Sequence, residues 1–493
     1  MIGVHLPALQ VVVPLVAAAL CAMLRRPFAA WALATATSWI AVLISALLLA
    51  RVMAEGQISY WLGSWQPPWG IEYRIDAASA LLLLLVSGVG AIIMPYARIS
   101  VGREVAPENQ PWYYATYLLC LTGLLGMSAT GDAFNVFVFM EVASLSSYVL
   151  IAMGRDRRAL FAAYQYLVLG TIGATFFIIG VGFLYVVTGT LNMADLATRL
   201  ATVEDVRPVV VGIAFLAVGL GLKSALFPLH YWLPNAYAYA PSVSTAFLAA
   251  TATKVAIYLL LRFFFTVLGP STPFAGSQIS TIWIAMSVAA MVLASVTAIH
   301  QAGIKRMLAY SSVAQIGYIT LGIGLASEMG LTGALVHLFN HAVMKGALFL
   351  LIGGAILRGG DVTVDSLAGL ARRMPATFAG IVIAGLSLIG VPGTVGFVGK
   401  WLLVAAALEQ GLVWLAVAIV GSSALAVVYV WRIIEVACFK PAATDTEVSE
   451  MPPSMLIPAW VLVGFCLYFG LDTSLTTEVA GRAARLLITG VPG

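Results

Sequence analysis

The protein has 493 residues, of which 61% are hydrophobic and only 9% are charged. Soluble domains carry about 25% charged residues, so this composition excludes a chain whose whole surface faces water. Apolar stretches long enough to cross about 30 Å of hydrocarbon recur along the whole length. The net charge of +4 is not gathered into a basic run, which argues against nucleic acid as a partner. We therefore predict an all-α polytopic membrane protein.

Hydropathy predicts about fourteen transmembrane helices. The first is expected to be a retained span, because neither a positively charged n-region nor a small-residue cleavage site marks a signal peptide. The thirteenth interval is long, and a helix break after Gly396–Gly399 is expected to fall inside the membrane. The predicted spans are 5–24, 29–51, 76–97, 112–130, 132–153, 160–188, 208–227, 242–265, 279–299, 307–326, 331–357, 377–398, 401–436 and 454–471.

The Lys and Arg residues test this number of spans. Alternating loops place fourteen of them on one side and seven on the other, and Lys305, Arg306 and Arg262 count as ordinary residues of those loops. The richer side is expected to be cytoplasmic, so both termini are predicted on the non-cytoplasmic side of the inner (plasma) membrane. The four cysteines show no paired or metal-ligand spacing and are expected to be small core residues.

Five ionisable residues lie inside apolar sequence: Glu141, Lys223, Lys254, Lys345 and Lys400. A charged side chain at mid-membrane costs about 2.5–3.5 kcal/mol, so the five would cost about 12–17 kcal/mol if they faced lipid. We therefore expect them to face the interior of the bundle or a hydrated cavity.

Glu141 lies in FNVFVFMEVASLSSYVL and Lys223 in GLGLKSALFPLHYWLPNAY. An ion pair between them would keep both groups charged until a proton arrives. Pro228 and Pro234 follow the lysine, and prolines break membrane helices where the freed carbonyls line a cavity. The alternatives are a purely structural role for Glu141 and a Lys223 side chain that reaches the membrane interface.

The span 331–357 carries His337, His341 and Lys345 at positions i, i+4 and i+8, which places them on one face of the helix. Titratable groups about 6 Å apart along the membrane normal suit a proton relay. A zinc site would need a third ligand, which the neighbouring sequence does not supply. Structural hydrogen bonds are the remaining alternative.

Lys254 lies too deep in its span to reach the interface, and burial suits an ammonium group to reversible protonation. Lys400 follows GVPGTVGFVGK, which predicts a broken helix beside the lysine, with a plain loop as the alternative. A histidine between the prolines would either link Lys223 to Lys254 or serve a structural role. The accessory candidates are this histidine and three residues expected to coordinate water: His230, Ser311, Ser312 and Gln315.

Lys223 and Lys400 each lie beside a helix broken by glycine or proline, five spans apart and so in opposite orientation. This arrangement predicts two inverted five-helix repeats. The expected divisions are 1–111 (helices 1–3), 112–265 (helices 4–8), 279–440 (helices 9–13) and 441–493 (helix 14 and a tail).

Five segments carry a family resemblance: GDAFNVFVFMEVASLSSYVL, GLKSALFPLHYWLPNAYAYAPSVSTAFL, IKRMLAYSSVAQIGY, LFNHAVMKGALF and GVPGTVGFVGKW. In this order they resemble the antiporter-like subunits shared by Mrp-type multisubunit cation/proton antiporters and the membrane arm of respiratory complex I. The resemblance covers about residues 75–440, and the length and the wording FNVFVFMEV are most similar to the Mrp D-type subunit.

The resemblance implies a role for each matching residue on a central proton path. Glu141 resembles the family's essential glutamate and Lys223 its lysine partner. The remaining positions resemble a bridging lysine, two linker histidines, a polar companion and an exit-side group, at Lys254, His337, His341, Lys345 and Lys400 respectively.

The chain departs from the family near the expected cytoplasmic entrance. Asn235-Ala236-Tyr237 stands where the family often has Asp-Ala-His, and Ala302-Gly303 stands where an acidic residue is common. These departures leave proton uptake at the entrance unassigned.

The resemblance implies a subunit that exchanges protons for a monovalent cation, Na⁺, beside other membrane subunits and lipid and without a metal or cofactor. No catalytic triad, phosphate-binding loop or set of redox-cofactor ligands is visible in the sequence. One rival is a proton-pumping subunit of complex I or a membrane-bound hydrogenase. The other is a scaffold that transports nothing, against which the complete set of costly buried residues argues. The sequence assigns no path for Na⁺.

Overall fold

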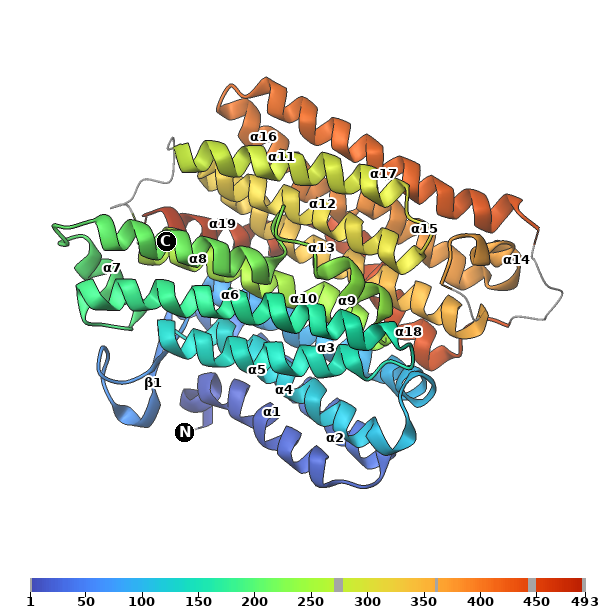
Figure 1. Cartoon of the computed structure of the whole chain (residues 1–493), viewed down its shortest axis with the longest axis horizontal. Helices are drawn as coiled ribbons and strands as arrows, with labels where there is room; N and C mark the ends of the chain where they lie inside the picture. Colours follow the sequence, from blue (N-terminus) through green and yellow to red (C-terminus); the bar gives the residue numbers. More distant parts are fainter. Residues whose placement is uncertain (1, 270–277, 360–361, 442–448, 490–493) are drawn as a thin grey trace.

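The computed structural model describes residues 2–269, 278–359, 362–441 and 449–489. Most of these residues form helices that run side by side in one bundle (Figure 1). Residues 442–448 and 490–493 of the predicted C-terminal segment lie outside the described ranges.

The helices and strands follow one another in the order of the predicted spans, with several short elements between them. The first part of the chain forms η1 (Ile2–His5), α1 (Leu6–Met23), α2 (Pro27–Glu55), β1 (Ile58–Trp61), η2 (Leu62–Ser64), β2 (Glu72–Ile75), α3 (Ala77–Glu104) and η3 (Pro107–Asn109). The middle forms α4 (Gln110–Ala129), α5 (Ala133–Ala152), α6 (Arg158–Thr188), α7 (Met193–Leu200), α8 (Arg207–Ser224), α9 (Leu233–Tyr239), α10 (Ser242–Leu261) and η4 (Arg262–Val267). The last part forms α11 (Gln278–Ile299), α12 (Ile304–Leu325), α13 (Glu328–Gly359), η6 (Asp365–Leu367), α14 (Leu370–Arg373), α15 (Pro375–Ile389), α16 (Val395–Glu409), α17 (Val413–Phe439), α18 (Pro453–Leu471) and α19 (Ser474–Thr489).

Twelve helices in the described residues are long and apolar enough to cross a membrane. The 20-residue helix α4 adds one crossing. Helices α15 and α16 have 15 residues each, about 22 Å, so neither covers about 30 Å of hydrocarbon alone and the two together form one broken span. The prediction of a polytopic helical protein with about fourteen spans is confirmed.

The break in this span lies at 390–394, so the predicted break after Gly396–Gly399 is wrong. Gly390 and Gly393 have φ values of +93° and +83°, which glycine adopts without strain, and they end α15. Gly396 and Gly399 lie inside α16, where they allow close packing. A Cβ atom on Gly399 would lie 2.7 Å from the Cβ of His337. The predicted interval 401–436 is also divided, because α16 ends at Glu409 and α17 begins at Val413.

The helices form an inner group and an outer group. In α13 every residue of the most apolar 18-residue stretch is buried, and in α10 and α12 the share is 94%. In the outer helices α6, α11 and α17 the share is 39%. Helix α13 packs against α10, α12, α15, α16, α18 and α19. Outer helices can therefore meet lipid with apolar faces while the inner helices hold polar groups.

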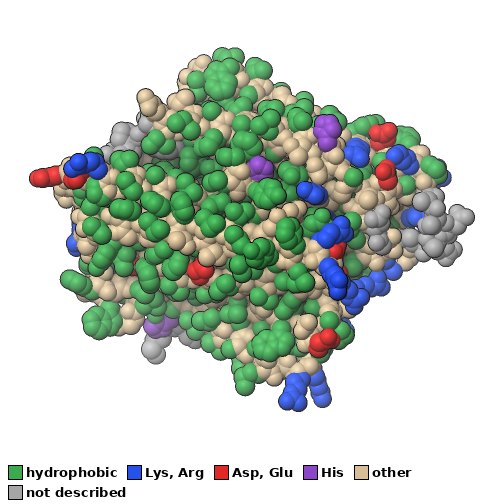
Figure 2. All heavy atoms as spheres, viewed as in Figure 1, with side chains coloured by type: hydrophobic (Ala, Val, Ile, Leu, Met, Phe, Trp, Pro, Cys, Tyr) green, Lys and Arg blue, Asp and Glu red, His purple; other side chains and the backbone are tan. Residues whose placement is uncertain are grey.

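The two ends of the bundle differ in charge. Hydrophobic side chains cover the middle of the face shown in Figure 2, and Lys and Arg gather at the end that carries α14. We call this the arginine-rich end. The paired strands β1 and β2, α7, the start of α1 and the end of α19 lie at the opposite end, which we call the hairpin end (Figure 1). The first and the last long described helices thus begin and end on one side, which agrees with an even number of spans.

Candidate functional site

The outer helix α5 and the broken helix α8 bring together the first pair of predicted residues. Glu141 Oε1 lies 3.8 Å from Lys223 Nζ, which also donates a 2.5 Å hydrogen bond to Ser144 Oγ, one turn after Glu141. Lys223 lies in the last turn of α8, which ends at Ser224, and the next residue, Ala225, has a φ of +55°. The ion pair therefore lies beside the helix break, as the prolines predict.

A small cavity of about 30 Å³ lies beside Lys223. Its polar lining comes from Lys223, Ser144, Ser147 and Tyr166, and its wall includes residues of α10. This volume has room for about two water molecules. The cavity thus leads from the ion pair toward the helix that carries Lys254.

Lys254 is fully buried near the middle of α10. Its Nζ donates to the backbone oxygen of Ala249 and, at 3.3 Å, to Thr253 Oγ1. Both partners are neutral oxygen atoms. The structure therefore gives this lysine hydrogen bonds without a carboxylate partner in the described part of the chain.

The face of α13 that carries three predicted residues packs against α12. His337 Nε2 lies 2.8 Å from Gln315 Oε1, and Lys345 Nζ donates to Ser311 Oγ and, at 2.9 Å, to the backbone oxygen of Leu308. Two of the three accessory residues of α12, Gln315 and Ser311, thus contact predicted residues of α13. The third residue, Ser312, instead donates to the backbone oxygen of Leu308 at 3.1 Å.

His341 lies in the fully buried interior, within electrostatic range of Lys254 and Lys345. Neither of its ring nitrogens has a hydrogen-bond partner among the described protein atoms. A buried polar group without a partner costs free energy, so such a group is a candidate for function. Its position connects the lysine of α10 to the lysine of α13.

Lys400 reaches the helix break from inside α16. Its Nζ donates to the backbone oxygens of Leu388 at 3.1 Å and Ile389 at 2.8 Å, which are among the last carbonyls of α15. The last carbonyls of a helix lack intrahelical partners and carry partial negative charge. The Nζ atom also lies 4.7 Å from the centre of the Tyr318 ring, and the lysine is within electrostatic range of His337.

His230 lies among aromatic side chains. Its ring stacks on Phe227 with centroids 5.3 Å apart and lies 6.4 Å from the ring of Tyr310. The hydrogen bonds within the described residues do not join it to Lys223 or Lys254. Its Nδ1 atom is buried without a hydrogen-bond partner among the described protein atoms, so the link and the structural role both stay predictions.

Several polar residues near the site escaped the sequence analysis. Asn340 Nδ2 donates to the backbone oxygen of Val395 at 2.6 Å and so ties α13 to the start of α16. The Tyr318 hydroxyl lies 2.6 Å from Ser422 Oγ. Asn340 lies between His337 and His341 in the sequence, and this position between two predicted residues was the available indication. Tyr318 gives no comparable signal, because tyrosine is common in apolar helices.

Two basic residues that the sequence analysis assigned to loops are buried. Lys305 is 5% exposed and donates to the backbone oxygen of Ala240 at 3.2 Å. Arg262 is 7% exposed and forms an ion pair with Asp76. Both lie near span ends, where the sequence alone does not separate a water-facing anchor from a residue covered by neighbouring helices. In the described residues, no three His, Cys, Asp or Glu side chains lie close enough to hold a metal ion.

Fourteen spans around a buried group of lysines and histidines define a polytopic membrane protein with titratable side chains in its core. The profile of one family matches residues 130–426, well over half of the chain. The chain belongs to this family, which is described as "NADH:quinone oxidoreductase/Mrp antiporter, TM". The resemblance found in the sequence motifs is confirmed.

Relatives of two kinds cover nearly the whole chain. It is 43% identical over 479 residues to the N-type NADH-quinone oxidoreductase subunit of Desulforudis audaxviator, covering 93% of this chain and 94% of the relative. It is 31% identical over 488 residues to the D-type Na(+)/H(+) antiporter subunit of Bacillus subtilis, covering 97% and 96%.

Solved structures also fall into two kinds. A chain of the Mrp complex from Dietzia sp. matches with a TM-score of 0.90 and 27% identity, covering 100% of this chain and 98% of that one. A chain of the membrane-bound sulfane sulfur reductase, an archaeal respiratory membrane complex, matches with a TM-score of 0.89 and 30% identity, covering 98% of each.

Proposed function

We propose that this chain is the proton-translocating subunit of a multisubunit monovalent cation (Na⁺)/H⁺ antiporter, a secondary transporter rather than an enzyme. The observation that carries the proposal is the ion pair of Glu141 and Lys223 beside a helix break and a small polar cavity. The likeness to a D-type Na(+)/H(+) antiporter subunit and to the Mrp complex supports the cation as the exchanged ion.

The ion pair works as a switch in this proposal. A proton that reaches Glu141 neutralises the carboxylate and removes the charge that stabilises the Lys223 ammonium. Lys223 then releases one proton toward the cavity beside α10, and Glu141 passes its own proton to the neutral Lys223 amine, which restores the ion pair. Lys254 receives the proton among neutral oxygens, where nothing holds it permanently.

The second part of the path runs through the interior around α13. His341, Lys345, His337 and Lys400 would carry the proton onward, with Gln315 and Ser311 orienting two of them. We place these residues in two inverted five-helix repeats, α4–α10 and α11–α17, each with one broken helix. The segments before and after them, 1–111 and 441–493, would flank the repeats.

Glu141 lies on the outer face of the bundle. Its side chain is 28% exposed, and the exposed residues around it on α5 are apolar: Phe134, Val138, Leu145 and Val149. An ionised group facing hydrocarbon is costly, so we expect another membrane subunit to cover this face. We place the complex in the inner (plasma) membrane with the arginine-rich end in the cytoplasm and both termini outside.

The test compares Glu141→Ala with wild type in inverted vesicles that carry the whole complex. A proton gradient is formed, and its dissipation on addition of Na⁺ is measured. We expect the variant to assemble and to lose the Na⁺-dependent signal by about 100-fold, the lower range for a positioned proton-transfer group. Glu108→Ala is the control, because Glu108 is exposed in η3. Full activity in Glu141→Ala would remove Glu141 from the path.

One alternative function has its own support. The 43% identical relative is an N-type NADH-quinone oxidoreductase subunit, and one matching structure is a respiratory complex. In that case the same residues would pump protons under the control of redox chemistry in other subunits. A complex that ignores Na⁺ and other monovalent cations, but forms a proton gradient when supplied with an electron donor, would favour this alternative.

A further inference from the structure

A cavity of about 170 Å³ lies at the arginine-rich end, between the ends of several helices. Its apolar wall comes from the segment between α9 and α10 and from the end of α13. Its charged groups come from the end of α3, the turn between α5 and α6, the start of α6 and the start of α12, namely Arg103, Glu104, Arg155, Asp156, Arg158 and Lys305. Four basic groups and two carboxylates leave a net charge of +2. We call this the basic cavity.

Both carboxylates of the basic cavity already have partners. Glu104 accepts hydrogen bonds from the backbone N–H of Ser242 at 3.0 Å and from its Oγ at 2.9 Å, and so holds the N-terminus of α10. Asp156 pairs with Arg158 at 2.7 Å. The Arg158 guanidinium also lies 4.7 Å from the centre of the Tyr239 ring. These contacts fix the two negative charges in place.

The excess positive charge belongs to two arginines. Lys305 is within electrostatic range of Glu104, so its charge is partly balanced. Arg103 donates to the backbone oxygen of Leu357 at 3.2 Å, and Arg155 is exposed. Within the described residues, neither arginine has a carboxylate partner. Guanidinium groups bind phosphate oxygens in pairs, so an anion with a phosphate group suits this cavity.

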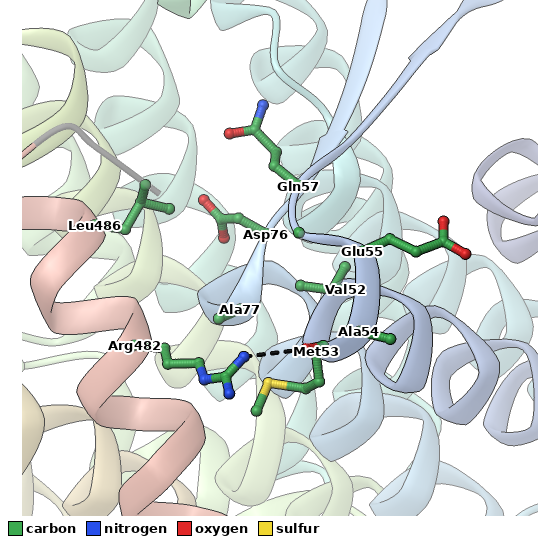
Figure 3. Close-up of a pocket in the computed structure, with 10 residues that line it drawn as sticks. Val52, Met53, Ala54, Glu55, Gln57, Asp76, Ala77, Arg482 and Leu486 are labelled. Atoms are coloured by element: carbon green, nitrogen blue, oxygen red, sulfur yellow. Dashed lines mark hydrogen bonds between the residues drawn. The ribbon is translucent and has the colours of Figure 1, made fainter. Parts of the chain in front are cut away.

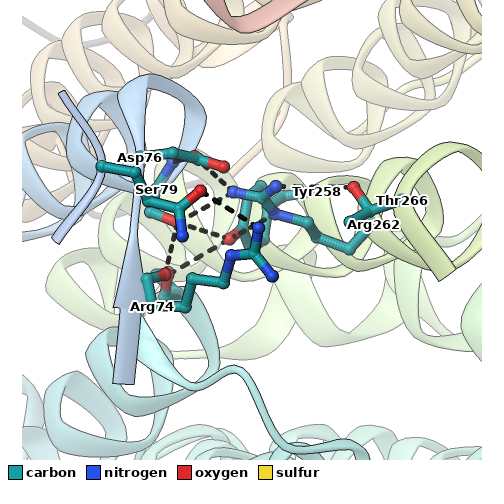
Figure 4. A network of polar contacts seen from close by, with 8 residues as sticks. Arg74, Asp76, Ser79, Tyr258, Arg262 and Thr266 are labelled. Atoms are coloured by element: carbon teal, nitrogen blue, oxygen red, sulfur yellow. Dashed lines mark hydrogen bonds and ion pairs between the residues drawn. The ribbon is translucent and has the colours of Figure 1, made fainter. Parts of the chain in front are cut away.

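The two cavities at the hairpin end offer no comparable charge. The smaller one, of about 280 Å³, has Glu55, Asp76 and Arg482 in its lining and a net charge of −1 (Figure 3). The larger one, of about 640 Å³, has Arg74, Arg262 and Asp76 in its lining and a net charge of +1. In the larger one Arg262 forms an ion pair with Asp76 (Figure 4). The basic cavity therefore differs from both in its surplus of arginine.

An apolar surface leads away from the basic cavity along α6. Its exposed residues are spaced three or four apart after Arg158, so they share one face, and they are 37% to 61% exposed: Leu160, Phe161, Tyr164, Val168 and Ile172. From residue 160 to residue 172 this face covers about 18 Å, slightly more than half of about 30 Å of hydrocarbon. A charged cavity followed by an apolar face as long as one leaflet matches the two parts of a phospholipid.

We propose that the basic cavity binds the phosphate group of an anionic phospholipid, with Arg103 and Arg155 at the phosphate and an acyl chain along the exposed face of α6. A zwitterionic lipid carries its own cation beside the phosphate, so it gains less from the two arginines. Free phosphate lacks the acyl chain that would cover α6. The site uses none of the residues of the proposed proton path, so it does not depend on which ion the chain exchanges.

The first test measures the thermal unfolding midpoint of the purified whole complex in a neutral detergent as phosphatidylglycerol is added. A ligand that binds the folded state raises this midpoint, and each form is compared with its own lipid-free midpoint. Each arginine near an anionic lipid contributes about fivefold in affinity. Arg103→Gln with Arg155→Gln should therefore weaken the binding of phosphatidylglycerol by about 25-fold.

The matched control is Arg25→Gln with Arg26→Gln. It removes two exposed arginines from the loop between α1 and α2, outside the lining of the basic cavity. The control is expected to keep the affinity of wild type, and phosphatidylcholine is expected to act equally on all forms. An equal loss of affinity in both double variants would show general attraction between charges and would overturn the site.

A second measurement locates the lipid. Phosphatidylglycerol with a photoreactive group in its acyl chain is bound to the complex and cross-linked, and the labelled peptides are identified by mass spectrometry. We expect labels on residues 160–172 in wild type and in the control, and their loss in Arg103→Gln with Arg155→Gln. Phosphatidylcholine with the same group should label this stretch much less.

Inorganic phosphate, added without lipid, separates the two sources of the anion. If it raises the midpoint through the two arginines while the lipid leaves α6 unlabelled, the cavity takes a free anion and the lipid proposal is overturned. Labels on α6 that persist without the two arginines also overturn it, as does the absence of any shift that depends on them. Arginine-dependent labels on α6, together with an arginine-dependent rise of the midpoint, support the lipid site.

Discussion

In the first half of the bundle Lys223 faces the carboxylate of Glu141 at 3.8 Å. In the second half, the partners of Lys345 and Lys400 within the described residues are hydroxyl, carbonyl and aromatic groups. The two regions also differ in the exposure of their charged side chains. Glu141 keeps 28% of its side chain exposed, and Lys345 is fully buried. One region holds a charge pair at the edge of the bundle, and the other holds, at its centre, amines that have no counter-charge in the part of the chain that the structure describes.

The difference indicates two ways to handle a positive charge in a membrane. A paired lysine keeps its proton until the partner carboxylate is neutralised, so an event at the bundle surface can control it. A lysine among neutral oxygens is expensive to charge, so it suits brief occupation by a proton in transit. In this comparison the first region decides when a proton moves, and the second region passes it on.

Removing one amine from each region should give the largest contrast. Lys223→Met leaves Glu141 without its positive partner. We expect the unfolding free energy to fall by about 1–3 kcal/mol, less than the 3–5 kcal/mol for a fully buried pair because Glu141 is partly exposed. Lys345→Met removes a buried amine that has no counter-charge, so its stability should stay equal or rise. Both variants should lose exchange. The measurement is the thermal unfolding midpoint of the purified complex in detergent.

Lys440→Met is the control for these variants, since Lys440 is exposed and its ion-pair partner among the described residues is the exposed Asp365. It should change neither the midpoint nor the exchange rate. Equal destabilisation by Lys223→Met and Lys345→Met would contradict the difference between the two regions. Loss of the Lys345 amine would then cost as much stability as loss of the amine that pairs with Glu141.

A smaller effect is expected from the hydrogen bond that orients His337. Gln315→Leu removes the acceptor 2.8 Å from His337 Nε2. One lost hydrogen bond is worth about 0.5–1.5 kcal/mol, so the exchange rate should fall about 2–10-fold. Gln301→Leu is the matched control, because Gln301 donates at 3.1 Å to a backbone oxygen of its own helix end. An unchanged rate in Gln315→Leu would show that His337 needs no fixed orientation.

The sequence was sufficient to predict the membrane spans and the burial of the charged residues inside them. Charged residues such as Glu141 and Lys254 inside long apolar stretches carry their own signal, because lipid exposure is too expensive wherever the helices pack. Gly390 and Gly399 show what the sequence alone does not predict, namely which glycine of a glycine-rich run ends a helix. One glycine ends a helix at positive φ and the other makes room for His337, and both stand in the same glycine-rich run.

Residues near span ends were harder to place than residues at mid-membrane. Arg262 and Lys305 were expected in loops, but neighbouring helices and the segments around them bury both. The strands β1 and β2, α7 and α19 were not predicted either, since short and amphipathic elements between spans lack a hydropathy signal. The cavity beside the buried pair of Asp76 and Arg262 is lined by residues of β2, α7, η4 and α19, so the tertiary structure was required to find it.

The smallest expected effect concerns Asp132, which caps α5, the helix that carries Glu141. Asp132 Oδ1 accepts a 2.7 Å hydrogen bond from the backbone N–H of Asn135. Burial raises the pKa of Asp132, and the backbone hydrogen bonds from Asn135 and Phe134 offset only part of that rise. A carboxyl with a raised folded-state pKa contributes stability below its unfolded pKa and loses it as the pH rises through the folded pKa.

Asp132→Asn keeps the cap and cannot ionise. We therefore expect the variant to be more stable than wild type at neutral pH, by less than about 1 kcal/mol. The difference should shrink as the pH falls toward about 4, where the wild-type carboxyl takes up its proton. Unfolding midpoints across this pH range measure the effect. If the variant is less stable at neutral pH, the charge of Asp132 stabilises the N-terminus of α5 through the helix dipole, and the first region depends on two carboxylates instead of one.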